Sequence, residues 1–166
     1  MIEPVSSTYK ILKEKVCNAD IDENWMDWAI EMMESGFEVD SLYQLAGISK
    51  PFNQFELQEL TNKVLEDLSL DFSDKEKTIR NYVYFTIMSN IENTSKYFDV
   101  LKEFRDIYYE LDMVSEYQSF ALLYWAKLDL VSEEVQWYWD GADRSNIDKI
   151  IKEQFELWII EFDNEK

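Results

Sequence analysis

Residues 145–162 read SNIDKIIKEQFELWIIEF and carry the clearest helical pattern of the chain. Apolar residues recur there every three or four positions, as they do when one face of an α-helix packs against a core. This face consists of Ile147, Ile150, Ile151, Phe155, Trp158, Ile159 and Phe162. Ser145 is a suitable N-cap. The pattern predicts a long final helix.

The same periodicity extends over the rest of the chain. It predicts further helices that begin near Ser7, Asp22, Asp40, Asn53, Ser73, Thr94, Ser115 and Ser132. Three glycines and two prolines are too few for the many tight turns of a sandwich or barrel. We therefore predict an all-α fold over residues 1–166, a single domain in which about eight or nine helices form an irregular bundle or array with short loops and antiparallel neighbours.

Local sequence signals predict where several helices begin and end. Asp22 is a suitable N-cap, and Gly36 a suitable C′ residue, for the second helix. Ser73–Glu76 and Ser115–Gln118 have the spacing of capping boxes. Ser132 is predicted to cap an eighth helix that runs through Trp139 and is broken by Gly141.

The charge of the chain is strongly one-sided. It has 35 acidic and 16 basic residues, no histidine, one cysteine and a formal net charge of −19. Such a charge attracts basic surfaces and repels nucleic acid and anionic membranes. The chain has neither a signal-peptide pattern nor a run of about 20 apolar residues. With Cys17 as the single cysteine, these features favour a cytoplasmic protein.

The absence of histidine excludes most familiar catalytic and metal sites. Ser-His-Asp and Cys-His sites, histidine-containing zinc sites and Glu-x-x-His di-iron sites all require it. No phosphate-binding glycine motif is present either. We therefore expect no enzyme activity, no catalytic residue, no metal site and no cofactor. The alternative left open is a carboxylate-based enzyme, with Mg²⁺ held by Asp and Glu.

A calcium site is a second alternative for the carboxylates. Asp140, Asp143 and Asp148 lie close together in sequence around Gly141. Arg144 interrupts this segment, which lacks the alternating acids and terminal glutamate of an EF-hand loop. A helix-capping turn is the favoured interpretation.

The second predicted helix carries a row of acids. Glu23, Asp27, Glu31 and Glu34 recur at steps of four, four and three, and Asp20 and Asp22 extend the row. Like charges at this spacing cost about 0.2–0.5 kcal/mol per pair in an isolated helix. The row is either a solvated outer face or a docking surface for a basic partner.

A second acidic segment also contains large aromatic residues. It comprises Glu133, Glu134, Trp137, Tyr138, Trp139, Asp140 and Asp143. Trp and Tyr are enriched among the residues that contribute most to protein–protein binding. Trp137 and Trp139 are two positions apart, so on a helix they would point to different sides. Either both are buried between helices, or one is exposed for binding.

Residues 22–68 resemble small all-helical bacterial proteins of polymorphic toxin and contact-dependent inhibition loci. The resemblance rests on helix stops and apolar positions from Trp28-Ala29 through Gly36, Asp40-Ser41 and Leu45-Ala46-Gly47 to Phe55-Glu56-Leu57. Some of those proteins are thought to be immunity proteins. The resemblance implies a partner-binding role and no catalytic residue.

The sequence thus predicts a protein-binding module, of the kind that neutralises a basic partner such as a nuclease toxin. Charge would speed and orient the encounter, and aromatic contacts would supply affinity. Its expected binding residues are Asp20, Asp22, Glu23, Asp27, Glu31, Glu34, Glu133, Glu134, Trp137, Asp140 and Asp143. The alternatives are the carboxylate-based enzyme and a scaffold domain that associates with copies of itself.

Overall fold

A computed structural model describes residues 1–166 as a helical protein without β-strands, which confirms the predicted fold class. The α-helices are α1 (Thr8–Val16), α2 (Glu23–Glu34), α3 (Asp40–Ala46), α4 (Gln54–Asp67), α5 (Lys75–Asn90), α6 (Tyr97–Glu110), α7 (Gln118–Ser132) and α8 (Ile147–Asn164). Two short 3₁₀ helices, η1 (Thr94–Lys96) and η2 (Ser115–Tyr117), precede α6 and α7. None of the helices is both long enough and apolar enough to cross a bilayer.

The contacts of the chain divide it into two compact units, residues 1–82 and residues 83–166. The division falls inside α5, so this helix contributes residues to both units. The single domain expected from the sequence stays a prediction.

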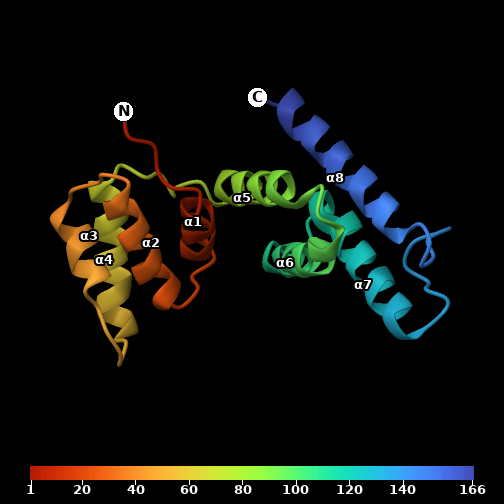
Figure 1. The fold of residues 1–166 in the computed structure, drawn as a ribbon, viewed down its shortest axis with the longest axis horizontal. Helices are drawn as coiled ribbons and strands as arrows, with labels where there is room; N and C mark the ends of the chain where they lie inside the picture. Colours follow the sequence, from red (N-terminus) through yellow and green to blue (C-terminus); the bar gives the residue numbers. More distant parts are fainter. The chain divides into compact units, whose positions relative to one another are not determined.

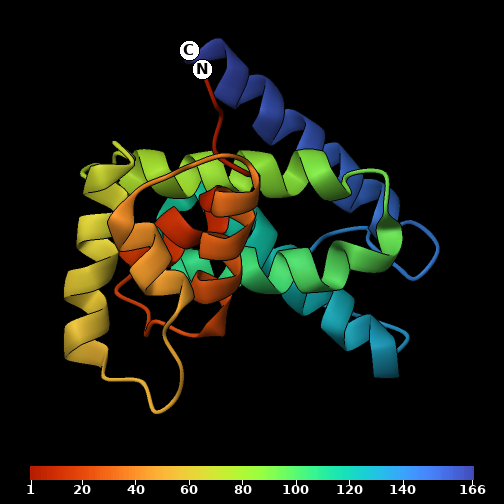
Figure 2. The same cartoon turned by 60° about the vertical axis from the view of Figure 1, so that its left-hand side comes forward.

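The first unit is built around the apolar face of α2, which packs with α1 and α3, while α3 also packs on α4 (Figures 1 and 2). Trp25 and Trp28 are fully buried and meet edge to face, with 5.8 Å between ring centroids. The Trp28 indole Nε1–H donates to Thr8 Oγ1 at 2.9 Å, so a buried polar contact ties α1 to α2. Both indoles of α2 thus lie on the buried face of this helix.

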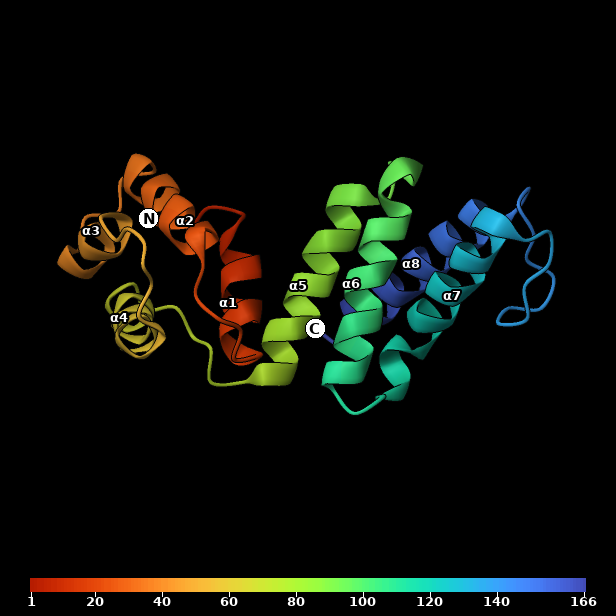
Figure 3. The ribbon, with the colours of Figure 1, turned by 90° about the horizontal axis from the view of Figure 1, so that it is seen from below.

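The second unit has an aromatic core in which α6, α7 and α8 lie side by side (Figure 3). Phe155 of α8 is fully buried. Its ring contacts Tyr97, Phe104 and Phe120, with centroid distances of 5.4, 6.1 and 5.5 Å. Edge-to-face packing of this kind adds stability beyond the area buried. The apolar stripe of residues 145–162 is therefore the face that closes this core.

Some of the predicted helix caps are confirmed and others are wrong. Asp22 accepts from the Asn24 N–H at 3.0 Å, and Gly36 follows α2 with a φ of 99°. Ser73 caps nothing, because Asp74 accepts from the N–H of Lys77 instead. Ser115 begins a 3₁₀ turn without a side-chain cap. At α5 the neighbouring Asp74 takes over the cap, which the spacing alone does not reveal.

Lys15 is a buried lysine in the first unit that has no carboxylate partner. Its ammonium donates to the backbone oxygen and the side-chain Oε1 of Gln58, at 3.2 and 2.9 Å, and to Thr61 Oγ1 at 2.9 Å. These bonds join α1 to α4. Burial lowers the pKa of Lys15 to about 8, because the charged form is desolvated.

The lowered pKa of Lys15 predicts a specific pH dependence of stability. Between pH 8 and about 10.5 the unfolded chain holds a proton at Lys15 that the folded chain has released, so the free energy of unfolding rises with pH. A Lys15→Met variant lacks this rise. Urea denaturation at pH 7 and pH 10 measures the free energy of unfolding of the wild type and of each variant. From pH 7 to pH 10 the wild type should gain stability relative to Lys15→Met but not relative to Lys149→Met, because Lys149 is exposed. A stability difference between the wild type and Lys15→Met that is the same at both pH values contradicts the lowered pKa of Lys15.

Candidate protein-binding site

The acids of α2 face away from the core of the first unit. Trp25, Met26, Trp28, Ala29 and Met32 are buried, whereas Glu23, Asp27, Glu31 and Glu34 are exposed. Asp20 and Asp22, just before the helix, are exposed as well. The predicted acidic row is therefore a continuous solvent-facing stripe of one helix.

Local contacts neutralise this stripe only in part. Glu23 pairs with Lys50, and Glu31 accepts from the Ser7 hydroxyl. Asp22 is engaged as the helix cap. Asp27 and Glu34, which lie between and beyond these contacts, have no ion-pair partner. Most of the negative charge of α2 is thus open to a molecule that approaches from solvent.

The second candidate segment, residues 133–146, is an ordered loop and not a helix. The predicted helix from Ser132 through Trp139 is wrong, because Ser132 is the last residue of α7. The loop lies beyond the ends of α7 and α8, which it connects (Figures 1 and 3). The reason is Gln136, whose buried side chain satisfies backbone groups that helical hydrogen bonds would otherwise take up.

Gln136 uses all of its hydrogen-bonding capacity inside the loop. Its Oε1 accepts from the N–H groups of Tyr138 and Trp139, each at 2.8 Å. Its Nε2 donates to the carbonyl oxygens of Trp139 and Ala142, at 2.5 and 3.0 Å. Two acceptor and two donor contacts fix both the position and the orientation of the amide.

Two further residues close the loop onto the helices. Arg144 donates from Nε and Nη2 to the carbonyl oxygens of Leu130 and Glu133, each at 2.8 Å, and so caps the end of α7. Asn146 Nδ2 donates to the Gly141 carbonyl at 2.8 Å. The backbone of this loop is therefore held at both ends as well as in its middle.

Asp143 belongs to the capping turn before α8. Its Oδ1 accepts from the backbone and side chain of Ser145 and from the Asn146 N–H, and these bonds hold the pKa of Asp143 below its usual value. Asp148 pairs with Lys127 at 2.6 Å. Ser145, predicted to cap α8, is thus a donor to the cap and not the cap itself. No group of three or more His, Cys, Asp or Glu side chains in the chain is arranged to hold a metal ion.

The two tryptophans of the loop differ sharply in exposure. Trp137 is 87% exposed, whereas Trp139 is half-buried. Glu133, Glu134, Asp140 and Asp143 are all exposed. One of the two predicted binding surfaces is therefore a loop that combines an exposed indole with carboxylates, and the other is the stripe on α2.

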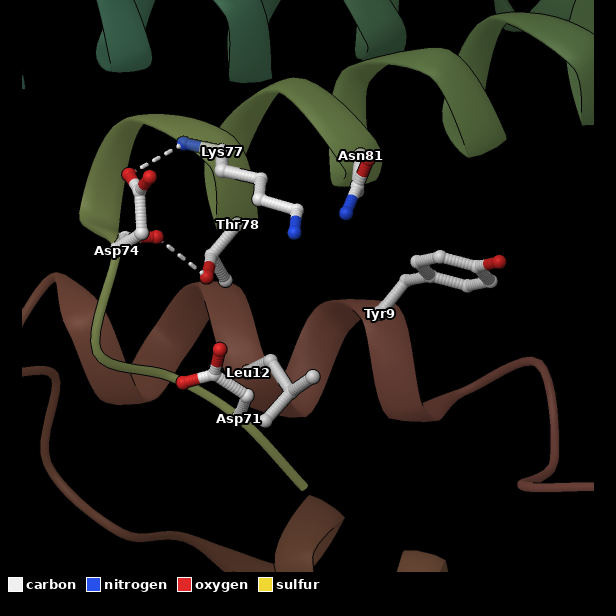
Figure 4. A pocket seen from close by; sticks show the side chains of 7 residues that line it. All are labelled: Tyr9, Leu12, Asp71, Asp74, Lys77, Thr78 and Asn81. Carbon is white, nitrogen blue, oxygen red and sulfur yellow. Dashed lines mark hydrogen bonds between the residues drawn. The ribbon is translucent and has the colours of Figure 1, made fainter. Parts of the chain in front are cut away.

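A small pocket in the first unit is lined mainly by polar side chains. It measures about 190 Å³ and lies between α1 and α5, where Tyr9, Leu12, Asp71, Asp74, Lys77, Thr78 and Asn81 line it (Figure 4). Its two acids are already engaged, because Asp74 caps α5 and Asp71 accepts from the N–H and hydroxyl of Ser73. The pocket carboxylates stabilise local turns.

Sequence reasoning missed Gln136, the residue that organises the loop. A single glutamine among acids and aromatics carries no periodic or spacing signal.

Comparison of the chain with family models, with curated proteins and with solved structures finds no match.

Proposed function

We propose that this chain is a protein-binding module that captures a basic protein partner in the cytoplasm and acts as an immunity-type inhibitor, not as an enzyme. The observation that carries the proposal is the outward orientation of the predicted acids. All ten expected binding carboxylates are exposed, on α2 and the turn before it and in the loop before α8. A carboxylate enzyme would need them to converge on a pocket.

Two further considerations support a different molecule as the partner. At a net charge of −19, two copies of this chain repel each other, which disfavours a scaffold built from acidic surfaces. An acidic surface also matches enzymes that act on nucleic acids, since those enzymes are basic where they bind phosphates. Charge complementarity of this kind accelerates association more than it slows dissociation.

The test is reversal of the α2 stripe, by Glu23→Lys, Asp27→Lys, Glu31→Lys and Glu34→Lys together. A partner is first co-purified with the native protein and identified. The association rate constant for this partner should then fall about tenfold at low salt, and the difference should shrink at high salt because ions screen the charges. The fold should persist, since all four side chains are exposed.

A control variant separates local charge from net charge. Reversal of Glu59, Glu66, Glu156 and Glu161, which are exposed on α4 and α8, changes the net charge equally. We expect a much smaller loss of association rate from this variant. Association that is insensitive both to reversal of the α2 stripe and to salt contradicts the proposed function.

A further inference from the structure

The end of α7 and the loop before α8 expose four large apolar side chains. Val131, Val135, Trp137 and Tyr138 are 73%, 61%, 87% and 43% exposed, within eight consecutive residues. Large apolar side chains that are exposed this close together in sequence indicate a candidate interaction site. We name these four residues the Trp137 patch.

The Trp137 patch stands on a backbone that is already ordered. The four hydrogen bonds of Gln136 hold residues 136–142, and those of Arg144 attach the loop to the end of α7. A surface that is ordered before binding loses less conformational entropy when its partner arrives. Trp137 is thus suited to act as a binding anchor.

The charged residues of the loop indicate which kind of side chain would bind Trp137. Glu133, Glu134 and Asp140 are exposed and have no ion-pair partner, and Arg144 is the only basic residue between Val131 and Asn146. Arg144 donates to backbone carbonyls and not to these carboxylates. The loop therefore carries uncompensated negative charge as well as an exposed indole.

We propose that the Trp137 patch is the anchoring site for a basic partner and that an arginine side chain of this partner stacks on the Trp137 ring. Indole is the best aromatic acceptor for a cation. The planar guanidinium stacks on it and can also bind a carboxylate through two parallel hydrogen bonds, which an ammonium cannot do. This inference rests on the proposed function and specifies the residue class that the partner contributes.

The direct test uses two peptide probes of equal charge, nona-arginine and nona-lysine. Titration of the full chain should shift the indole N–H resonance of Trp137, assigned from a Trp137→Phe variant, and nona-arginine should bind more tightly than nona-lysine. Trp137→Ala should weaken nona-arginine binding about tenfold and remove the preference for arginine. Phe55→Ala, which removes an aromatic ring that is 74% exposed on α4, is the matched control and should change neither.

The outcomes distinguish this inference from the proposed function. An unshifted Trp137 resonance, or equal binding of nona-arginine by wild type and Trp137→Ala, overturns the role of the patch. If Trp137→Ala also leaves the affinity for the co-purified partner unchanged while reversal of the α2 stripe slows its association, the proposed function stands and the patch does not anchor the partner. If neither change affects the partner, both proposals fall.

Discussion

A Gln136→Glu variant is expected to lose about 3 kcal/mol of unfolding free energy at pH 7, although the two side chains are nearly identical in shape. The substitution replaces the two N–H donors of the amide by an acceptor oxygen. In the wild type, the carbonyl oxygens of Trp139 and Ala142 accept hydrogen bonds from Gln136 Nε2. In the variant, the new carboxylate oxygen faces these two carbonyl oxygens without a hydrogen bond. A buried charge without a donor is among the costliest single changes in a protein.

The loss caused by Gln136→Glu should depend on pH. Burial raises the pKa of a carboxyl group, so stability is greatest where the carboxyl is protonated and falls as the pH rises through the raised pKa. The variant should therefore recover part of its stability near pH 4. Urea denaturation measures this directly, and amide hydrogen exchange of residues 133–146 should accelerate at pH 7.

Gln118→Glu is the control for Gln136→Glu. It makes the same substitution at the exposed first residue of α7, where an added carboxylate interacts favourably with the helix dipole. We expect a change within about 0.5 kcal/mol. Equal stabilities of the two variants would mean that Gln136 does not hold the loop.

Phe155→Ala is expected to cost about 3–5 kcal/mol, since it empties the centre of the second unit's core. Phe155 is fully buried, and its ring meets three other aromatic rings. This loss is a large part of the roughly 5–15 kcal/mol that stabilises a typical domain. Urea denaturation followed by circular dichroism measures it.

The control for Phe155→Ala lies two positions away on the same helix. Leu157 is 53% exposed, so Leu157→Ala should cost less than about 1 kcal/mol. A cost of Phe155→Ala that is no greater than this contradicts the assigned core.

Because α5 crosses both units, we also expect one cooperative transition in the wild type, whereas two separate transitions would show independent domains.

The helical elements could be predicted because burial imposes a period on the sequence. The stripes of α2 and α8 each alternate with charged residues, so the faces that are buried could be read directly. The exposed position of Glu23, Asp27, Glu31 and Glu34 followed from the same reasoning. Periodicity is strongest where one face meets a core and the other meets water.

The loop before α8 could not be predicted because its order does not come from periodicity. Trp137, Tyr138 and Trp139 are apolar enough to suggest a helix. Gln136 instead binds the backbone N–H groups of Tyr138 and Trp139, and Arg144 binds the carbonyl oxygens of Leu130 and Glu133, so the chain follows an irregular path. The hydrogen bonds of Gln136 and Arg144 depend on a backbone geometry that exists only in the folded chain, so they leave no pattern in the sequence. The burial of Gln136 and the exposure of Trp137 both result from this geometry, and neither could be predicted.

Chemical footprinting of carboxylates in the presence and absence of the co-purified partner tests the central claim most directly. A carbodiimide couples glycine ethyl ester to exposed Asp and Glu side chains, and mass spectrometry reports the extent at each one. Bound partner should reduce labelling of Asp27 and Glu34 on α2, while Glu66 and Glu161 stay unchanged. Undiminished labelling of Asp27 and Glu34 in a saturated complex would show that the partner binds elsewhere and that these acids only keep the surface hydrated.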